Sequence, residues 1–183
     1  FDENGNGDGG VHKYSQDDRQ VLGHENPNWI IGLNNTFVYK DFDLTIYAMG
    51  RFGQTIYSKM LGSYTAKSGI GTNQISGIDY WTEENQGAYY PRPGSGDDQT
   101  IGNTAINVYD GSFIKIKNIT LGYTLPKSIS KHALMEKCRF YFTAYNPWIF
   151  AMDSKLKGTD PEMGGSDTFP TYKQFVFGIN ITF

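Results

Sequence analysis

The first residues of the chain have the spacing of oxygen ligands in a calcium-binding loop. In the stretch DENGNGDGG, carboxylate and amide oxygens alternate along a segment that glycine allows to turn sharply. The candidate ligands are Asp2, Asn4, Asn6 and Asp8, with Asp17 or Asp18 completing the shell. The twelfth position of such a loop carries an acid, whereas this chain has Lys13 there. The stretch therefore predicts either a calcium site, with calcium as the one cofactor, or a Gly/Asn-rich loop exposed to solvent.

A second candidate site lies in the stretch DYWTEENQGAYYPRP. Its aromatic and basic residues are Tyr80, Trp81, Tyr89, Tyr90 and Arg92. Flat rings can stack on the apolar faces of sugar rings, while a guanidinium or carboxylate group holds the hydroxyls. The same residues also suit packing of a long loop against itself. We therefore expect a substrate-binding site here, with loop packing as the alternative role.

Residues suited to catalysis are not arranged for it in this sequence. Glu83 and Glu84 are adjacent, so they would face opposite sides of a strand, and the spacing fixes no second acid opposite them. The sequence contains no G-x-S-x-G, H-E-x-x-H or P-loop motif. We predict that the chain is not an enzyme. The net charge of −3 also gives no basic field for nucleic acid.

The composition favours strands joined by long polar loops. The chain of 183 residues has 13 Tyr, 12 Phe and 22 Gly, yet its mean hydropathy is only −0.48. No apolar run approaches the roughly 18 residues of a membrane helix. Membrane strands need only about 10 alternating residues each, so a membrane location remains open.

Five segments alternate between apolar and polar residues, as strands with one apolar face do. They are residues 29–40, 42–53, 112–126, 138–150 and 174–183. We expect the apolar face to include Phe37, Leu44, Ile46, Phe140, Phe142, Phe175, Phe177 and Ile179. We expect the opposite face to include Tyr47, Arg51, Arg139, Tyr141 and Asn180.

Three local features modify this pattern. The alternation reverses within 112–126, which a β-bulge or an exit from the apolar zone would explain. Pro147 is expected to limit the upper end of the fourth strand, because proline cannot donate a ladder hydrogen bond. Residues 127–137 have room for about one helical turn.

The connections alternate in length along the chain. A short turn near residue 41 is followed by a long loop over 54–111, a short connection over 127–137 and a long loop over 151–173. In an up-and-down sheet all long loops then lie at one end, as in outer-membrane barrels. Five strands cannot close a barrel, and open edges cannot face lipid. We predict an all-β, antiparallel, up-and-down transmembrane β-barrel segment at 29–183, preceded by an extracellular loop at 1–28.

Several motifs resemble the C-terminal end of SusC/RagA-family TonB-dependent transporters. They are SFIKIKNITLGYTLPKSI, TAYNPWIF, KGTDPEMGG and the closing QFVFGINITF, and residues 2–53 resemble the preceding region of the same family. The resemblance implies that these five strands complete a plugged barrel of about 22 strands. It also implies import of a nutrient across the bacterial outer membrane, with a SusD-like surface lipoprotein as partner and with TonB reached through a missing N-terminal part.

The resemblance gives the last strand a further role. An alternating final strand that ends in an aromatic residue resembles the signal read by the barrel-assembly machinery, here Phe175, Phe177, Ile179, Ile181 and Phe183. The C-terminus would then be periplasmic and the long loops extracellular. Among ligands, the family and the loop aromatics lead us to expect a glycan or oligosaccharide rather than a peptide, and outer-membrane lipid around the strands.

Two other classes of protein fit part of the pattern. A secreted, calcium-stabilised β-sandwich that binds carbohydrate would explain the alternation, although not the rhythm of the loops. An adhesion repeat would require an internal period, and the sequence shows none.

Overall fold

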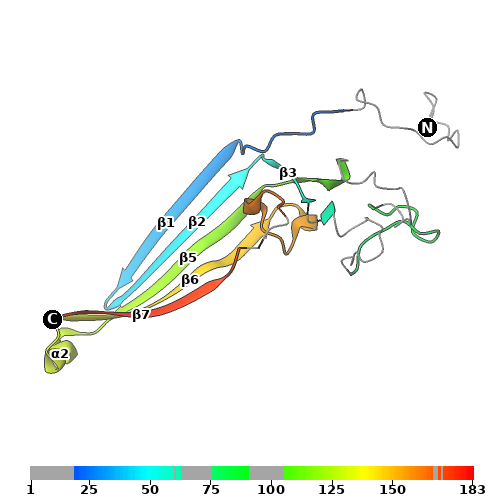
Figure 1. Cartoon of the computed structure of the whole chain (residues 1–183). Helices are drawn as coiled ribbons and strands as arrows, with labels where there is room; N and C mark the ends of the chain where they lie inside the picture. Colours follow the sequence, from blue (N-terminus) through cyan, green and yellow to red (C-terminus); the bar gives the residue numbers. More distant parts are fainter. Residues whose placement is uncertain (1–18, 60, 63–75, 91–104, 167–168, 170) are drawn as a thin grey trace, which may run out of the picture.

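The computed structural model describes residues 19–59, 61–62, 76–90, 105–166, 169 and 171–183. Its main element is one antiparallel sheet of five long strands in the order β1-β2-β5-β6-β7. The strands are β1 (Trp29–Tyr39), β2 (Phe42–Phe52), β5 (Phe113–Thr124), β6 (Lys137–Ala151) and β7 (Gln174–Thr182). Figure 1 shows them side by side in one long, twisted sheet. The five strands expected from alternation are thus confirmed as consecutive neighbours.

The register aligns the apolar residues of all five strands into rows. In one row Phe37 pairs with Leu44, Leu44 with Leu121, Leu121 with Phe142 and Phe142 with Phe177. Because side chains alternate between faces, this register places the apolar residues of every strand on the same face. We call it the apolar face and the opposite one the inner face.

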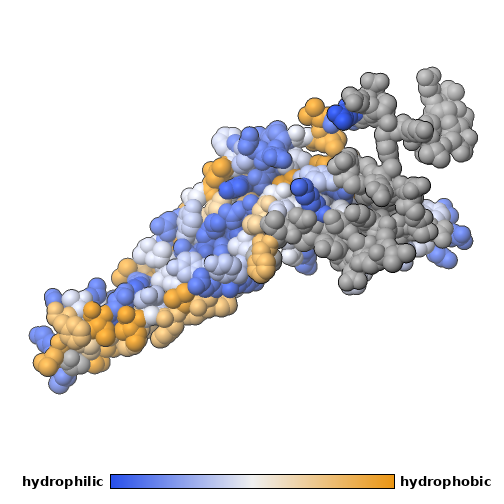
Figure 2. All heavy atoms as spheres, in the orientation of Figure 1, coloured by the Kyte–Doolittle hydropathy of each residue, from blue (hydrophilic) through white to orange (hydrophobic). Residues whose placement is uncertain are grey.

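The apolar face has no layer packed over it in the described part of the chain. Phe177 is 72% exposed, Phe37, Leu121 and Phe142 of its row are exposed as well, and Leu44 is half-buried. Figure 2 views the sheet from the polar inner face, with hydrophobic atoms emerging mainly along its margin. In a β-sandwich these side chains would pack against a second sheet. The sandwich hypothesis is therefore wrong for this fold.

A β-bulge at Lys117 explains the reversed alternation in the third long segment. Along β5, Asn118 pairs with Tyr47 and Ile116 with Ala48, so Lys117 has no partner on β2. The extra residue returns Ile116 to the apolar face, as expected for a bulge.

Pro147 does not end β6, contrary to the expectation from sequence. The strand continues to Ala151, and its ladder to β5 omits only Asn146 and Pro147. Asn146 adopts a left-handed backbone conformation with φ 49°. Placing proline at an irregularity of the ladder removes the need for its missing N–H.

The two ends of the sheet differ in their connections (Figure 1). At one end β1 and β2 are joined through Lys40, and the helical turns α2 (Lys127–Ser130) and η4 (Lys131–Ala133) lie between β5 and β6. The long connections emerge at the other end. Among the described residues, no helix is long and apolar enough to cross a membrane.

The long connections contain regular structure that the sequence pattern did not reveal. It comprises β3 (Thr55–Tyr57), η3 (Ala105–Asn107), β4 (Val108–Asp110), η5 (Ser154–Leu156) and η6 (Pro161–Met163). Strands β3 and β4 pair as a separate two-stranded sheet. A small hydrophobic core of Ile56, Leu61, Tyr109 and Leu156 joins the two long connections. The described parts of these connections are therefore folded.

Candidate functional site

Hydroxyl groups line the middle of the inner face. Thr36 and Thr45 share a hydrogen bond between their Oγ1 atoms at 3.2 Å, and Thr120 and Thr143 share one at 2.9 Å. Thr45 also pairs with Thr120 in the register, so the four threonines form one row across four strands. Cross-strand pairs of this kind stabilise a sheet and keep its surface polar.

An ion pair crosses the inner face nearer to the short connections. Arg139 Nε and Nη2 donate to Asp43 Oδ1 and Oδ2 at 2.9 and 2.5 Å. The two residues lie on β6 and β2, and Gly122 of the intervening β5 leaves the space between them. Arg139 also lies over the ring of Tyr141, 5.6 Å from its centroid. The inner face thus presents fixed polar and charged groups.

The two long connections are bound to each other at the far end of the sheet. We call their described parts the mouth loops: residues 53–59, 61–62, 76–90 and 105–112 form the first loop, and residues 152–166 form the second. Lys59 N donates to Gly165 O at 2.9 Å. Gly165 has φ 75°, and a Cβ there would collide with the backbone of Tyr57. This close approach requires glycine.

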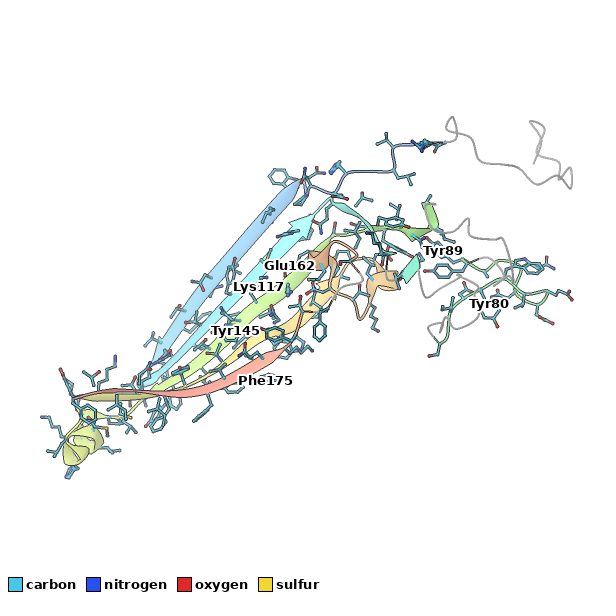
Figure 3. All side chains as sticks on the ribbon, viewed as in Figure 1. Tyr80, Tyr89, Lys117, Tyr145, Glu162 and Phe175 are labelled. Carbon is cyan, nitrogen blue, oxygen red and sulfur yellow. The ribbon has the colours of Figure 1, made fainter. Side chains whose placement is uncertain are left out.

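Two lysines of β5 fasten the second mouth loop to the sheet. Lys115 Nζ contacts Asp160 Oδ2 and Glu162 Oε2, each at 2.6 Å, and Lys117 Nζ contacts Glu162 Oε1 at 2.6 Å. We call these four residues the lysine clamp. Lys115 is only 1% exposed. Figure 3 shows Lys117 and Glu162 next to each other over the face of β5.

The charges of the clamp determine the titration of Glu162. Burial alone would raise the pKa of Glu162, but the hydrogen bonds and positive charges of Lys115 and Lys117 outweigh it. The net effect is a pKa of Glu162 below the ordinary value of 4.5. Glu162 is therefore ionised at neutral pH.

The predicted substrate-binding aromatics occupy two different environments. Tyr80 and Tyr89 are about two-fifths exposed, and Trp81 is half-buried. Tyr90 is 8% exposed, and its hydroxyl hydrogen-bonds to that of Tyr109 at 2.9 Å. Burial raises the pKa of both Tyr90 and Tyr109. Tyr90 thus contributes to loop packing, whereas Tyr80 and Tyr89 keep accessible ring surface.

Lys155 of the second mouth loop contacts Tyr89 of the first. Its Nζ lies 4.1 Å from the centroid of the Tyr89 ring, a cation–π contact. Asp79 accepts one hydrogen bond from Asn85 Nδ2 at 2.7 Å and another from Tyr89 N at 3.1 Å. The Asn85 hydrogen bond is the main cause of a lowered Asp79 pKa. Asp79 therefore fixes the turn that presents Tyr89.

Some of the predicted site residues are outside the described residues. These are Arg92 and the calcium candidates Asp2, Asn4, Asn6, Asp8 and Asp18. Within the described ranges, no group of three or more His, Cys, Asp or Glu side chains could hold a metal ion. The calcium site stays a prediction.

Sequence reasoning missed Lys155 and the lysine clamp. Lys115 and Asp160 are 45 residues apart, and neither stands out in its own segment. The one available signal was the DPE triplet inside KGTDPEMGG, which places two acids on a proline-containing turn. Their partners depend on the register of β5.

The last strand exposes its apolar side chains. The predicted assembly-signal residues Phe175, Phe177, Ile179 and Ile181 all project from the apolar face of β7, and Phe183 is 85% exposed just beyond it. Because β7 pairs only with β6, its other edge is free in the described structure. The assembly role stays a prediction.

Comparisons with known proteins identify relatives along the whole chain. No model of a known protein family matches. The chain is 27% identical over 197 residues to TonB-dependent receptor P3 of Formosa agariphila, covering 100% of this chain and 18% of the receptor. It is 29% identical over 194 residues to TonB-dependent receptor P26 of the same organism, covering 97% and 19%. It is 27% identical over 188 residues to TonB-dependent receptor SusC of Bacteroides thetaiotaomicron, covering 100% and 17%.

Solved structures share the fold of the sheet and its connections. The RagAB peptide importer in its open-open state matches with a TM-score of 0.73 at 24% identity, covering 93% of this chain and 19% of the matched chain. Its closed-closed state matches with a TM-score of 0.71 at 23% identity and the same coverage. The chain thus spans less than a fifth of the length of these proteins. These findings confirm the expected resemblance: the homologues of this chain are TonB-dependent receptors, SusC among them, and its fold is that of one segment of the RagAB transporter.

Proposed function

We propose that this chain forms part of the wall and mouth of an outer-membrane barrel that imports a nutrient with energy delivered by TonB. The observation that carries this proposal is the apolar face, which runs in register over five strands without a covering layer. Hydrocarbon is the environment in which such a face is stable. The polar inner face would then surround a plug or a water-filled lumen.

The dimensions of the strands suit this role. Strands of 11 residues rise about 36 Å, and a tilt near 40° leaves roughly 28 Å of height, close to the apolar band of a membrane barrel. The outer edges of β1 and β7 have no neighbour in the described sheet. In lipid their N–H and C=O groups need partners, so the remaining strands come from the rest of the protein.

The asymmetry of the connections supports an orientation. The short connections and the C-terminus lie at one end of the sheet, and the mouth loops lie at the other (Figure 1). Membrane barrels of bacteria have short periplasmic turns and longer extracellular loops. We place the C-terminus in the periplasm and the mouth loops outside the cell, where a SusD-like lipoprotein would cover them.

For the ligand, we propose a glycan or oligosaccharide. The exposed rings of Tyr80 and Tyr89 offer flat apolar surfaces beside the charged groups of Lys155 and Asp79. A peptide is the alternative, because RagAB is a peptide importer. We also propose that the outward residues of β7 carry the barrel-assembly signal.

Uptake by intact cells tests the function and the ligand class together. Cells that lack the full-length transporter are complemented with it and supplied with labelled oligosaccharide mixtures or labelled peptide mixtures. We expect energy-dependent uptake of oligosaccharides that Tyr89→Ala reduces about fivefold or more, since stacking of a nucleic-acid base on an aromatic side chain contributes about 1–3 kcal/mol. Tyr172→Ala, which removes an exposed tyrosine outside the mouth loops, serves as the matched control. Uptake of peptides alone would refute the glycan assignment, and uptake of neither would refute import.

A further inference from the structure

Lys115 is a buried charge on the inner face, near the mouth loops and away from the ion pair of Asp43 and Arg139. Removing such a charge from water is strongly unfavourable unless it is paired, and here a carboxylate oxygen of Asp160 and one of Glu162 each lie 2.6 Å from Lys115 Nζ. Well-packed apolar side chains often give comparable stability at such a position. What the charged cluster adds is a fixed contact between β5 and the mouth loop that carries Asp160 and Glu162.

The second mouth loop is held at several points besides the clamp. Leu156 is 1% exposed in the small core that joins the two loops. Asp153 and Asp160 each accept a backbone hydrogen bond that starts a helical turn, from Lys155 N at 2.9 Å and Glu162 N at 3.0 Å. The loop thus has internal order as well as attachment to the sheet.

The clamp lies close in sequence to Lys155. Lys155 belongs to η5, which precedes the clamp acids by only a few residues within the same ordered loop. Its contact with Tyr89 forms one side of the candidate ligand site. If the loop left the sheet, Lys155 would leave Tyr89.

We propose that Lys115 is a positioning residue that keeps residues 152–166 on the inner face throughout the transport cycle. This mouth loop is then a stationary wall of the ligand path. That a ligand passes this loop rests on the proposed import function.

A distance measurement between spin labels tests the proposal without any ligand. Lys157→Cys labels the loop and Lys137→Cys labels the start of β6, since both lysines are exposed. The labels are introduced into the full-length transporter, in a background without other reactive cysteines, and distances are measured by pulsed electron resonance in intact cells. Samples are compared before and after a protonophore removes the energy supply of TonB. We expect one narrow distance peak in both conditions.

Variants of the clamp then test the role of Lys115 itself. Lys115→Met, and separately the pair Asp160→Asn with Glu162→Gln, should broaden the peak or add a second one. Lys127→Met removes an exposed lysine at the other end of the sheet and should leave the peak unchanged. The acid pair keeps the test informative if Lys115→Met does not assemble.

Two results would overturn the proposal. Two peaks in the unmodified clamp, or a shift with the protonophore, would show that the loop moves. An unchanged narrow peak in the clamp variants would show that Lys115 does not position it. Because the measurement is independent of uptake, it separates failure of this proposal from failure of the import function.

Discussion

The ion pair between Asp43 and Arg139 depends on a residue that takes no part in it. Gly122 lies between the two side chains, and a Cβ built there would meet both the Asp43 carboxylate and the Arg139 guanidinium. Gly178 has the same relation to the ring of Tyr141. Because glycine has no side chain, charged and aromatic side chains of the neighbouring strands can lie directly over its backbone.

Replacement of Gly122 by alanine should therefore destabilise the barrel. The added methyl group displaces Arg139 or Asp43, and overpacking of this kind costs about 1–3 kcal/mol. Gly32→Ala is the matched control, because its nearest neighbour would be Tyr47 at an ordinary 3.7 Å. The loss of heat-modifiable mobility on gels, measured against temperature, compares the two variants. Equal midpoints would contradict this role of Gly122.

Glu162 gives the lysine clamp a defined dependence on pH. Its pKa is lowered in the folded protein, so its contribution to stability is present above the ordinary pKa of 4.5 and is lost as pH falls through the lower folded value. The spin-label peak of the second mouth loop should stay narrow from pH 8 down to pH 5 and broaden only below pH 4.5. Broadening between pH 7 and pH 5 would contradict the ionised clamp.

At the scale of elements, the bulge in β5 keeps two halves of one strand on the same face. Without Lys117, Ile116 would directly precede Asn118, and plain alternation would keep Ile116 on the apolar face and Lys115 on the inner face. We therefore expect the full-length barrel to assemble when Lys117 is deleted, measured as folded protein in the outer membrane. An alanine inserted between Thr120 and Leu121 shifts half of the strand by one residue, exchanges its two faces and should abolish assembly. Loss of assembly on deletion of Lys117 would refute its role as the extra residue of the bulge.

The long strands were predictable because each has enough alternating residues to define two faces. Their observed bounds lie within two residues of the predicted ones at each end. The reversal in 112–126 predicted a bulge or an exit from the apolar zone, and the structure shows the bulge. The expected effect of Pro147 on the strand end was wrong. The sequence shows that proline lacks an N–H, but it does not show that residue 147 has no partner in the hydrogen-bond ladder to β5.

Short or distant features could not be predicted in the same way. Strands β3 and β4 have three residues each, too few for a periodic signal, and they meet only after about 50 intervening residues. The aromatic residues of the first mouth loop were found by type, yet only the structure separates buried Tyr90 from exposed Tyr89. Pairing across the fold decided these roles.

At the scale of the whole molecule, the five strands pair in one continuous sheet, but the sheet does not close into a barrel. Both outer edges are unpaired in the described structure, and the apolar face is uncovered. Residues 1–183 expressed alone should therefore aggregate in water and require detergent to stay dispersed. Size-exclusion chromatography without detergent checks this expectation. A monodisperse monomer would mean that the apolar face is covered by protein.

The central claim is that hydrocarbon contacts the apolar face and that the inner face does not meet lipid. Assembly of the full-length transporter with Phe177→Lys, compared with Gln174→Lys on the same strand, tests it most directly. A lysine near the middle of the lipid-facing band should cost about 2–4 kcal/mol, whereas one on the inner face should be tolerated. We expect a strong loss of folded barrel for Phe177→Lys alone; equal assembly of the two variants would mean that the apolar face does not contact lipid.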